Sequence, residues 1–464
     1  MKLIYNVEAK PREIGYGKLI VFALQQMLAI LAATIAVPYI VGNGMSQSAA
    51  LFGAGVGTLV YLLFTKFRSP VFLGSSFAFL GSMFAAFAGA ASMNVGYLGL
   101  LMGAVFAGLV YVIIAVTVKF VGVAWINKLM PAVVIGPTVA IIGLSLAGNA
   151  VGDALTGLSL TGGMTLKSSL SLICALVTLC TVILCSVYAK KTLRTIPFIV
   201  GILAGYMLAT IITLIGKAAT NDAMLLISWD GFKNMQWVPD FTFLKAFKGF
   251  KDLTAAYVGT VAVAYIPVAF VVFAEHLADH KNISSIIEKD LLEDPGLDKT
   301  LLGDGVGSIA GAFFGGCPNT TYGESIGCVA ISGNASVVTI LCTSVICIVA
   351  AFLAPFVTFL ATIPACVMGG VCIALYGFIA VSGLKMIQKV DLEDNRNLFV
   401  VATILITGIG GMTLTFGKVT LTEIAVALIL GILVNLLVNL KKQPAEVEAS
   451  EKTEAPAEES KTEE

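Results

Sequence analysis

Long apolar segments recur along most of this sequence and restrict what the chain can fold into. From Lys18 to about Leu440 they follow one another at lengths of about 17 to 25 residues, enough for a helix to cross a hydrocarbon core of roughly 30 Å. A membrane β-barrel would instead show strands of about ten residues with alternating polarity. Of the 464 residues, 58% are hydrophobic and 12% are charged, and the mean hydropathy is +0.95. We therefore expect an all-α polytopic membrane protein.

The apolar segments form two sets of seven, which predicts fourteen transmembrane spans. The first set covers about 18–41, 48–65, 70–89, 96–118, 130–148, 168–188 and 196–216. The second set covers about 254–276, 301–316, 321–333, 336–360, 364–384, 396–416 and 419–440. A polar, Trp-containing segment, 217–253, separates the two sets.

Basic residues concentrate on alternate loops and indicate the orientation. They are Lys10, Arg12, Lys18, Lys66, Arg68, Lys119, Lys128, Lys190, Lys191, Arg194, Lys441 and Lys442. The positive-inside rule places these loops in the cytoplasm. We expect a multi-pass protein of the cell membrane with both termini cytoplasmic, a cytoplasmic N-terminus at 1–17 and an extracellular loop at 217–253. The Glu-rich segment 443–464 is typical of a disordered cytoplasmic tail.

Neither the cysteines nor the histidines indicate a metal site. The nine cysteines lie mostly in apolar segments without metal-ligand spacing, and the two histidines are His276 and His280. We expect no cofactor, no metal, no catalytic residue and no nucleic-acid partner. A membrane-embedded enzyme is a weak alternative, because no nucleophile–base pair is visible.

Two pairs of segments suggest that the two sets are copies of one unit. "MPAVVIGPTVAIIG" (Met130–Gly143) and "IPACVMGGVCIALYG" (Ile363–Gly377) share a Pro-Ala-x-Val-x-Gly core at the start of the fifth span of each set. "SPVFLGSSF" (Ser69–Phe77) and "CPNTTYGESI" (Cys317–Ile326) share a proline followed by Gly-x-Ser and a large apolar residue at the third. A unit with an odd number of spans must be inverted in its second copy, as in many secondary transporters.

The third span of each set is interrupted by Pro, Gly and Ser or Thr. Such irregular backbone survives at membrane depth only where it is buried in protein or lines a watered cavity. The interruptions of the two copies would meet at mid-membrane and offer backbone amides and half-helix N-termini to one ligand. Glu324 follows Gly323 at the start of such a half helix. Its carboxylate is therefore a candidate ligand-binding group.

A second group of acids lies in the segment "AEHLADH". Glu275 and Asp279 are four residues apart and share one helix face. Intramembrane acids are functional candidates by default, but Glu275 as the first residue of the cytoplasmic loop is an alternative, and we expect Asp279 to face that loop. We expect His276 and His280 to be solvated or packing residues. For Asp304, a helix N-cap is as consistent with its position as a coupling role.

Two carboxylates beside a ligand-sized cavity could accept hydrogen bonds from N–H donors and also take up a proton. Proton binding and ligand binding would then be energetically linked, which is the minimum requirement for symport. These residues predict a transporter of a polar, N–H-rich ligand, and they leave the ligand unnamed.

Four motifs give the chain a family resemblance. "AEH", "EKDLLEDPGL", "PNTTYGESIG" and "LGSSFAF" resemble those of bacterial uracil permeases of the nucleobase–cation symporter-2 (nucleobase–ascorbate) family, in the same order from about residue 10 to 440. The resemblance implies a seven-plus-seven inverted repeat with short antiparallel strands in spans three and ten. It also implies a core domain at 18–118 and 254–360, a gate domain at 130–216 and 364–440, and a homodimer through the gate domain.

The resemblance also implies roles for individual residues. Glu275 and Glu324 would bond the pyrimidine ring, and the backbone amides of Phe77 and Gly323 would approach a carbonyl oxygen. Tyr322 and Ser76 are neighbours on the same strands. Glu324 favours uracil, because the xanthine and urate carriers begin this motif with Gln-Asn.

The sequence departs from the family pattern at positions linked to proton handling. Gln26 and Asp279 stand where histidines are usual, and Ser325 replaces a frequent asparagine. The coupling route therefore stays open, with Glu275, Asp279, Gln26 and Asp304 as its candidates. We expect a proton-coupled uracil importer that works by alternating access. The alternatives are a purine permease of the same family, which would carry xanthine or guanine, and an anion transporter or channel on the same fold.

Overall fold

The computed structural model describes residues 3–122, 130–156, 163–190, 192–233, 235–416 and 419–440. The acidic tail at 443–464 and the basic residues Lys128, Lys191, Lys441 and Lys442 lie outside these ranges.

Most of the described chain is helical. Eight segments are long and apolar enough to cross a membrane: α2 (Tyr16–Val41), α3 (Gln47–Phe64), α5 (Met93–Val121), α7 with α8 (Ala132–Ser145 and Ala147–Leu155), α9 (Leu166–Tyr188), α11 (Pro197–Ala218), α13 (Ala255–Ile287) and α18 (Ala365–Ile387). A ninth is α16 (Val337–Ala350) with α17 (Ala354–Ala361), if this pair, bent by 83°, is one span.

The other predicted spans are shorter or more polar helices in the described chain. They are α4 (Leu80–Ala88), α14 (Leu297–Gly315), α15 (Gly323–Ser332), α19 (Asn395–Ile409) and α20 (Glu423–Val438). The connecting segments hold α1 (Pro11–Ile14), α10 (Thr192–Thr195), α12 (Thr242–Ala246), η1 (Asp222–Met224), η2 (Asp230–Lys233), η3 (Phe247–Asp252) and η4 (Leu292–Gly296).

Two short strands that are far apart in the sequence pair with each other. One precedes α4 along the chain, and the other precedes α15. Strand β1 (Leu73–Ser75) is antiparallel to β2 (Asn319–Thr321), and Gly74 lies opposite Thr320. The polar groups beside this pair are bonded by α3. Thr58 Oγ1 accepts from the Leu73 amide at 2.9 Å, and Asn319 Nδ2 donates to the Gly53 carbonyl at 3.2 Å. Contacts with α3 thus replace the water that such a short ladder would otherwise need. A second antiparallel pair joins β3 (Leu414–Phe416) to β4 (Val419–Leu421).

Glycines allow two pairs of helices to approach closely. A Cβ on Gly57 of α3 would lie 2.7 Å from the Gly307 carbonyl of α14, and a Cβ on Gly307 would lie 2.6 Å from the Gly57 carbonyl. In the other pair, a Cβ on Gly383 of α18 would lie 2.5 Å from the Gly136 carbonyl of α7. Small residues bring helix backbones together in membrane proteins, where close packing drives association.

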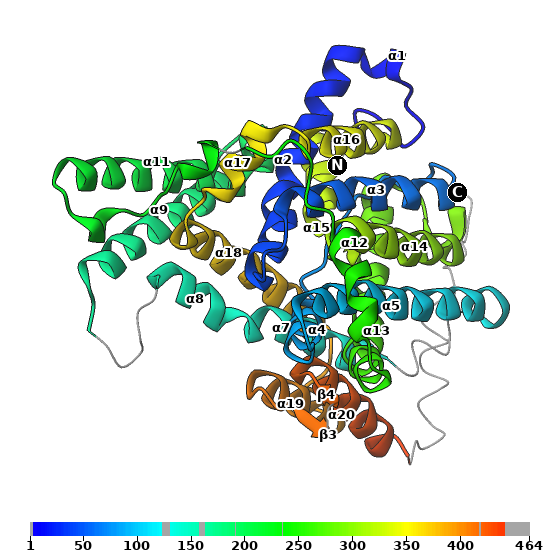
Figure 1. Ribbon diagram of the computed structural model, residues 1–464. Helices are drawn as coiled ribbons and strands as arrows, with labels where there is room; N and C mark the ends of the chain where they lie inside the picture. Colours follow the sequence, from blue (N-terminus) through cyan, green and yellow to red (C-terminus); the bar gives the residue numbers. More distant parts are fainter. Residues whose placement is uncertain are drawn as a thin grey trace.

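The helices form two groups (Figure 1). Helices α3, α5, α13 and α14 pack on one another, and α7, α9, α11 and α18 pack on one another. Helix α2 lies between them, and α19 and α20 pack together against α7. The boundary between these groups is where the candidate site lies.

Two boundaries predicted from the sequence are wrong. Helix α13 continues to Ile287 rather than ending near residue 276, because Ile283 and Ile287 keep one apolar face buried past the polar stretch. Helix α14 begins at Leu297 after Gly296, so Asp304 lies in the helix interior and is not an N-cap. Both errors come from ending a span where polar residues begin.

Candidate functional site

A cavity of about 330 Å³ lies between the two groups of helices. Its polar lining comes from α13 and the start of α15, and its opposite wall is mainly apolar and belongs to α7, α11 and α18. The lining residues are Val139, Phe198, Glu275, Ala278, Asp279, Gly323, Glu324, Phe378, Ile379, Ser382 and Met386. A space of about 50 Å³ shares Glu275, Gly323 and Glu324 with it and reaches Phe77, Thr320, Thr321 and Tyr322.

Helix α13 presents both of its candidate acids to this cavity. Glu275 and Asp279 are one helical turn apart, and Asp279 Oδ2 accepts a hydrogen bond of 2.6 Å from Thr321 Oγ1 on β2. The expectation that Asp279 faces the cytoplasmic loop is therefore wrong, as is the alternative that Glu275 begins that loop. The reason is again the length of α13, which carries both residues in its interior.

The half helix α15 begins at the cavity. Its N-cap, Tyr322, makes no side-chain cap, and Gly323 and Glu324 open its first turn. Tyr322 is instead fixed by its hydroxyl, which donates to the Ser75 carbonyl at 2.7 Å. The positive end of the helix dipole and the first N–H groups of the helix thus lie beside the cavity, an arrangement that favours a negatively polarised ligand atom.

A Cβ on Gly323 would have no heavy atom within 4 Å, which shows how open this position is.

Phe77 lines the smaller of the two spaces. Its ring is buried and meets the edge of Tyr376 at a centroid distance of 5.9 Å. Ser76 lines neither space. Its amide donates to the Pro318 carbonyl at 2.9 Å, which extends the strand ladder, and its buried hydroxyl has no partner among the described residues.

Gln26 also lies outside both cavity linings. It is buried on α2, and its Nε2 donates to Ser325 Oγ at 2.5 Å and to the Ser325 carbonyl at 3.1 Å. Its contact is therefore with the first turn of the half helix.

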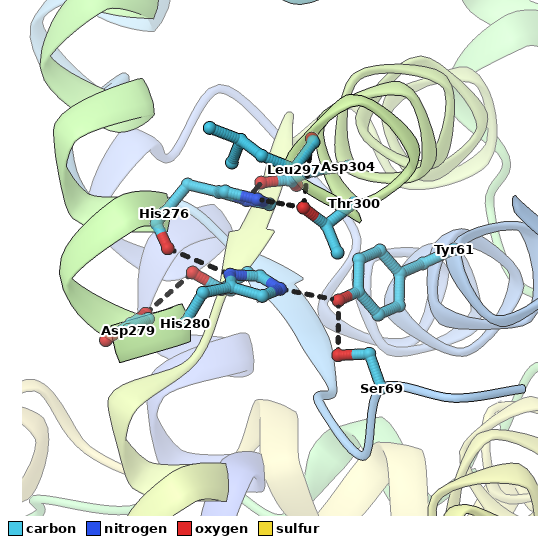
Figure 2. Close-up of polar contacts among 9 residues, drawn as sticks. Tyr61, Ser69, His276, Asp279, His280, Leu297, Thr300 and Asp304 are labelled. Atoms are coloured by element: carbon cyan, nitrogen blue, oxygen red, sulfur yellow. Dashed lines mark hydrogen bonds and ion pairs between the residues drawn. The ribbon is translucent and has the colours of Figure 1, made fainter. Parts of the chain in front are cut away.

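The neighbouring side of α13 carries a buried polar network (Figure 2). His276 Nδ1 lies 2.7 Å from Asp304 Oδ2, and His276 Nε2 lies 3.1 Å from Thr300 Oγ1. Thr300 donates its hydroxyl proton to the Leu297 carbonyl, so its oxygen accepts from His276 Nε2–H. Nδ1 and Asp304 must then share one proton, either as an imidazolium with a carboxylate or as a neutral pair.

His280 continues the network toward α3. Its Nδ1 donates to the His276 carbonyl at 2.8 Å, and its Nε2 lies 2.7 Å from the Tyr61 hydroxyl, which is 2.6 Å from Ser69 Oγ. The two imidazoles stack with centroids 4.0 Å apart. Both histidines are fully buried, so of the two expected environments they occupy the packed one and not the solvated one.

The structure therefore brings six of the predicted residues to one place. Glu275, Asp279, Gly323 and Glu324 line the larger cavity, and Phe77 and Tyr322 join three of them around the smaller space. Asp304, Gln26 and Ser76 line neither of the two spaces. The sequence reasoning missed Thr321 as the partner of Asp279 and His276 as the partner of Asp304. It also missed the apolar wall, whose residues have no pattern that separates them from lipid-facing ones.

Comparisons with known proteins place the chain in a family. The Permease family model named Xan_ur_permease matches residues 17–417. The uracil permease of Bacillus caldolyticus is 38% identical over 96% of this chain and 97% of its own length. The uracil permease of Escherichia coli strain K12 is 33% identical over 90% of each chain.

Solved structures show the fold at much lower identity. The transmembrane domain of the cyanobacterial bicarbonate transporter BicA is 16% identical, with a TM-score of 0.62 over 94% of this chain and all of that domain. The murine Solute Carrier 26 family member A9 anion transporter is 13% identical, with a TM-score of 0.63 over 91% of this chain and 68% of its own. The match along most of the sequence confirms the family resemblance: this chain belongs to the permease family that contains the bacterial uracil permeases.

Proposed function

We propose that this permease imports uracil together with a proton by alternating access. The observation that carries the proposal is the convergence of Glu275 from α13 and Glu324 from α15 on one cavity, in a chain 33–38% identical to several uracil permeases along nearly its whole length. Uracil is a small planar ring with N–H donors and carbonyl acceptors. Carboxylates that accept from the ring N–H groups and helix N-terminal amides that donate to a carbonyl are complementary to it.

In this proposal each wall of the cavity has its own task. Glu275 and Glu324 accept hydrogen bonds from the ring, and the amides of Phe77 and Gly323 donate to a carbonyl oxygen. Phe77 also packs on the ring face, and Tyr322 and Ser76 hold the two strands that position these groups. The apolar wall of Val139 and Phe378 excludes water from the bound base. A purine permease of the same family would use the same groups, and the relatives named above favour uracil.

The architecture that we propose for transport is a fourteen-span, seven-plus-seven inverted repeat. β1 with α4 and β2 with α15 would form its interrupted third and tenth spans, and the two groups of helices would be the core and gate domains. The gate domain would move against the core, and two copies would associate through it. We place the protein in the cell membrane with both termini in the cytoplasm, following the positive-inside rule.

Proton coupling needs a group that takes up a proton when the base binds. Glu275 and Asp279 lie one turn apart on the cavity, so a proton shared between them would remove the repulsion of two neighbouring carboxylates. Asp279 would act with Thr321 as its partner, while Asp304 would hold a second proton with His276. Gln26 does not titrate, and we assign it to positioning. The proton is the only coupling ion in this proposal, and no other cofactor is required.

The test is uptake of radiolabelled uracil into proteoliposomes, with an inward proton gradient and then with a protonophore. Uptake should collapse without the gradient and in Glu275→Gln and Glu324→Gln. Glu288→Gln, at the exposed end of the same helix α13, is the matched control and should transport normally. Xanthine uptake without uracil uptake would assign a purine substrate. Gradient-independent uracil flux would remove the symport, and anion flux alone would overturn the proposal.

A further inference from the structure

A short segment outside the transport site has a three-residue repeat. Residues 243–251, within "TFLKAFKGFKD", contain three interleaved rows: Phe243, Ala246 and Gly249; Leu244, Phe247 and Phe250; Lys245, Lys248 and Lys251. In the structure the segment is α12 followed by the 3₁₀ helix η3. Because a 3₁₀ helix has three residues per turn, residues three apart lie on the same side of η3.

The first row attaches the segment to the transmembrane helices. Phe243 stacks on Phe313 of α14, with centroids 4.8 Å apart and an interplanar angle of 6°. Ala246 and Gly249 are buried, and a Cβ on Gly249 would lie 2.5 Å from the Asn94 carbonyl in the first turn of α5. The segment is thus fixed beside the first turn of α5 and the last turn of α14. On the topology proposed above, these helix ends lie at the outer surface of the hydrocarbon core.

The second row is apolar and points outward. Leu244 is 52% exposed, Phe247 is 52% exposed and Phe250 is 56% exposed. Three large apolar side chains in one row are costly in water, and they are favourable at the boundary between headgroups and acyl chains.

The third row consists of three lysines, and their contacts differ along the segment. Lys245 is occupied, because its Nζ pairs with Asp240 and lies 3.3 Å from the Tyr97 hydroxyl. Lys248 and Lys251 are exposed, and neither forms an ion pair within the described part of the chain. Two free, positively charged ammonium groups beside an exposed apolar row are complementary to the negatively charged phosphates of lipids.

We propose that residues 242–252 form an interfacial segment that binds the bilayer surface. Leu244, Phe247 and Phe250 insert at the headgroup level, and Lys248 and Lys251 bind the phosphates of anionic phospholipids. On the proposed topology this is the outer leaflet. The segment would hold the group of helices that carries Glu275 at a fixed depth in the membrane.

The insertion is tested with a fluorescent probe in the segment. Phe250→Trp is introduced into a variant in which Trp125, Trp229 and Trp237 are each replaced by Phe. In phosphatidylcholine–phosphatidylglycerol vesicles, lipids brominated near the headgroup end of the acyl chain should quench the indole, and aqueous acrylamide should not. Strong acrylamide quenching with no effect of the brominated lipids would overturn the proposal. This readout needs no substrate, so it is independent of the uracil assignment.

The lipid charge is tested by thermal unfolding of the detergent-solubilised protein with added phosphatidylglycerol or phosphatidylcholine. Phosphatidylglycerol should raise the unfolding midpoint of the wild type more than phosphatidylcholine does. The double variant Lys248→Gln/Lys251→Gln should lose this difference, and Lys233→Gln, on another part of the same loop, should retain it. An equal response of the double variant would refute the phosphate contact. Conversion of a dimer to a monomer by Phe247→Ser/Phe250→Ser would instead identify the apolar row as a contact between copies.

Discussion

The side-chain amide of Gln26 on α2 donates to both oxygens of Ser325 on α15, at 2.5 Å to Oγ and 3.1 Å to the carbonyl. Both residues stand where the sequence departs from the family pattern, and the structure shows that they are partners. Since Ser325 follows Glu324 directly, this contact fixes the helical turn that carries Glu324, which we propose to bind uracil. Gln26 is therefore a positioning residue in our proposal.

Gln26→Ala should weaken uracil binding without changing its pH dependence. A lost buried hydrogen bond costs about 1–3 kcal/mol, which corresponds to roughly a 5- to 150-fold rise in KM if all of it is expressed in binding. Uptake kinetics between pH 5 and 8 measure both properties. Gln26→Asn keeps the amide and should recover part of the affinity. A flattened pH profile in Gln26→Ala would place the residue in the proton route instead.

Asp279→Asn should reduce the dependence of uptake on the proton gradient. The amide keeps a hydrogen-bonding oxygen for Thr321 but cannot exchange a proton at pH 5 to 8. Uracil counterflow, which needs no net proton movement, should survive in this variant. Thr321→Val removes the 2.6 Å hydrogen bond and keeps the carboxylate, so it should retain coupling. An unchanged pH dependence of uptake in Asp279→Asn would exclude this residue as the coupling group.

Gly323→Ala should abolish most uptake while leaving the protein folded. A Cβ at this position meets no atom within 4 Å, so the methyl group fits the helix but projects into the ligand space. We expect at least a tenfold loss of uracil uptake with an unchanged or slightly higher unfolding midpoint, since alanine favours helix over glycine by about 1 kcal/mol. Gly327→Ala lies on the same helix, is equally open and lines neither space, so it should transport normally.

Asp304→Ala should destabilise the protein strongly. The substitution leaves His276 buried without its partner, and breaking such a buried pair costs about 3–5 kcal/mol. His276→Leu/Asp304→Leu removes both polar groups and should recover much of the loss. Thermal unfolding in detergent measures the three proteins. A double variant that is no more stable than Asp304→Ala would show that the two side chains do not act as a pair.

The ion pairs of Asp294 should make stability sensitive to acid. Lys289 and Arg68 hydrogen-bond to its carboxylate and lower its pKa below the ordinary value of 3.8. A depressed pKa stabilises the fold above the ordinary value, and that contribution is lost as the pH falls through the folded-state pKa. Asp294→Asn should therefore be less stable than wild type at pH 6, and the difference should shrink as the pH falls below 3.8 and vanish below the folded-state pKa. A difference of the same size at pH 6 and at pH 3 would contradict this assignment.

The sequence predicted the membrane class, the family and the residues around the cavity, because burying an acid or breaking a span with Pro and Gly is costly enough to leave a visible signal. The prediction from sequence failed where the same polar residue types occur both in loops and in buried helices. The polar stretch after Glu275 resembles a loop, yet Ile283 and Ile287 keep it helical and Tyr61 satisfies His280. The partner of Asp304 could not be identified from spacing, since the contact with His276 depends on how α13 and α14 each pack on α5.

The two walls of the cavity differ in chemistry as well as in the helices that form them. The carboxylates come from α13 and α15, while Val139, Phe198 and Phe378 come from α7, α11 and α18. On the mechanism proposed above, what the permease recognises and how fast it turns over can therefore change by separate mutations. Substitutions on the apolar wall would alter the surface that moves past the bound base and leave the proposed hydrogen bonds intact. A permease built in this way would be able to tune its rate to the supply of a nutrient without giving up its choice of nutrient.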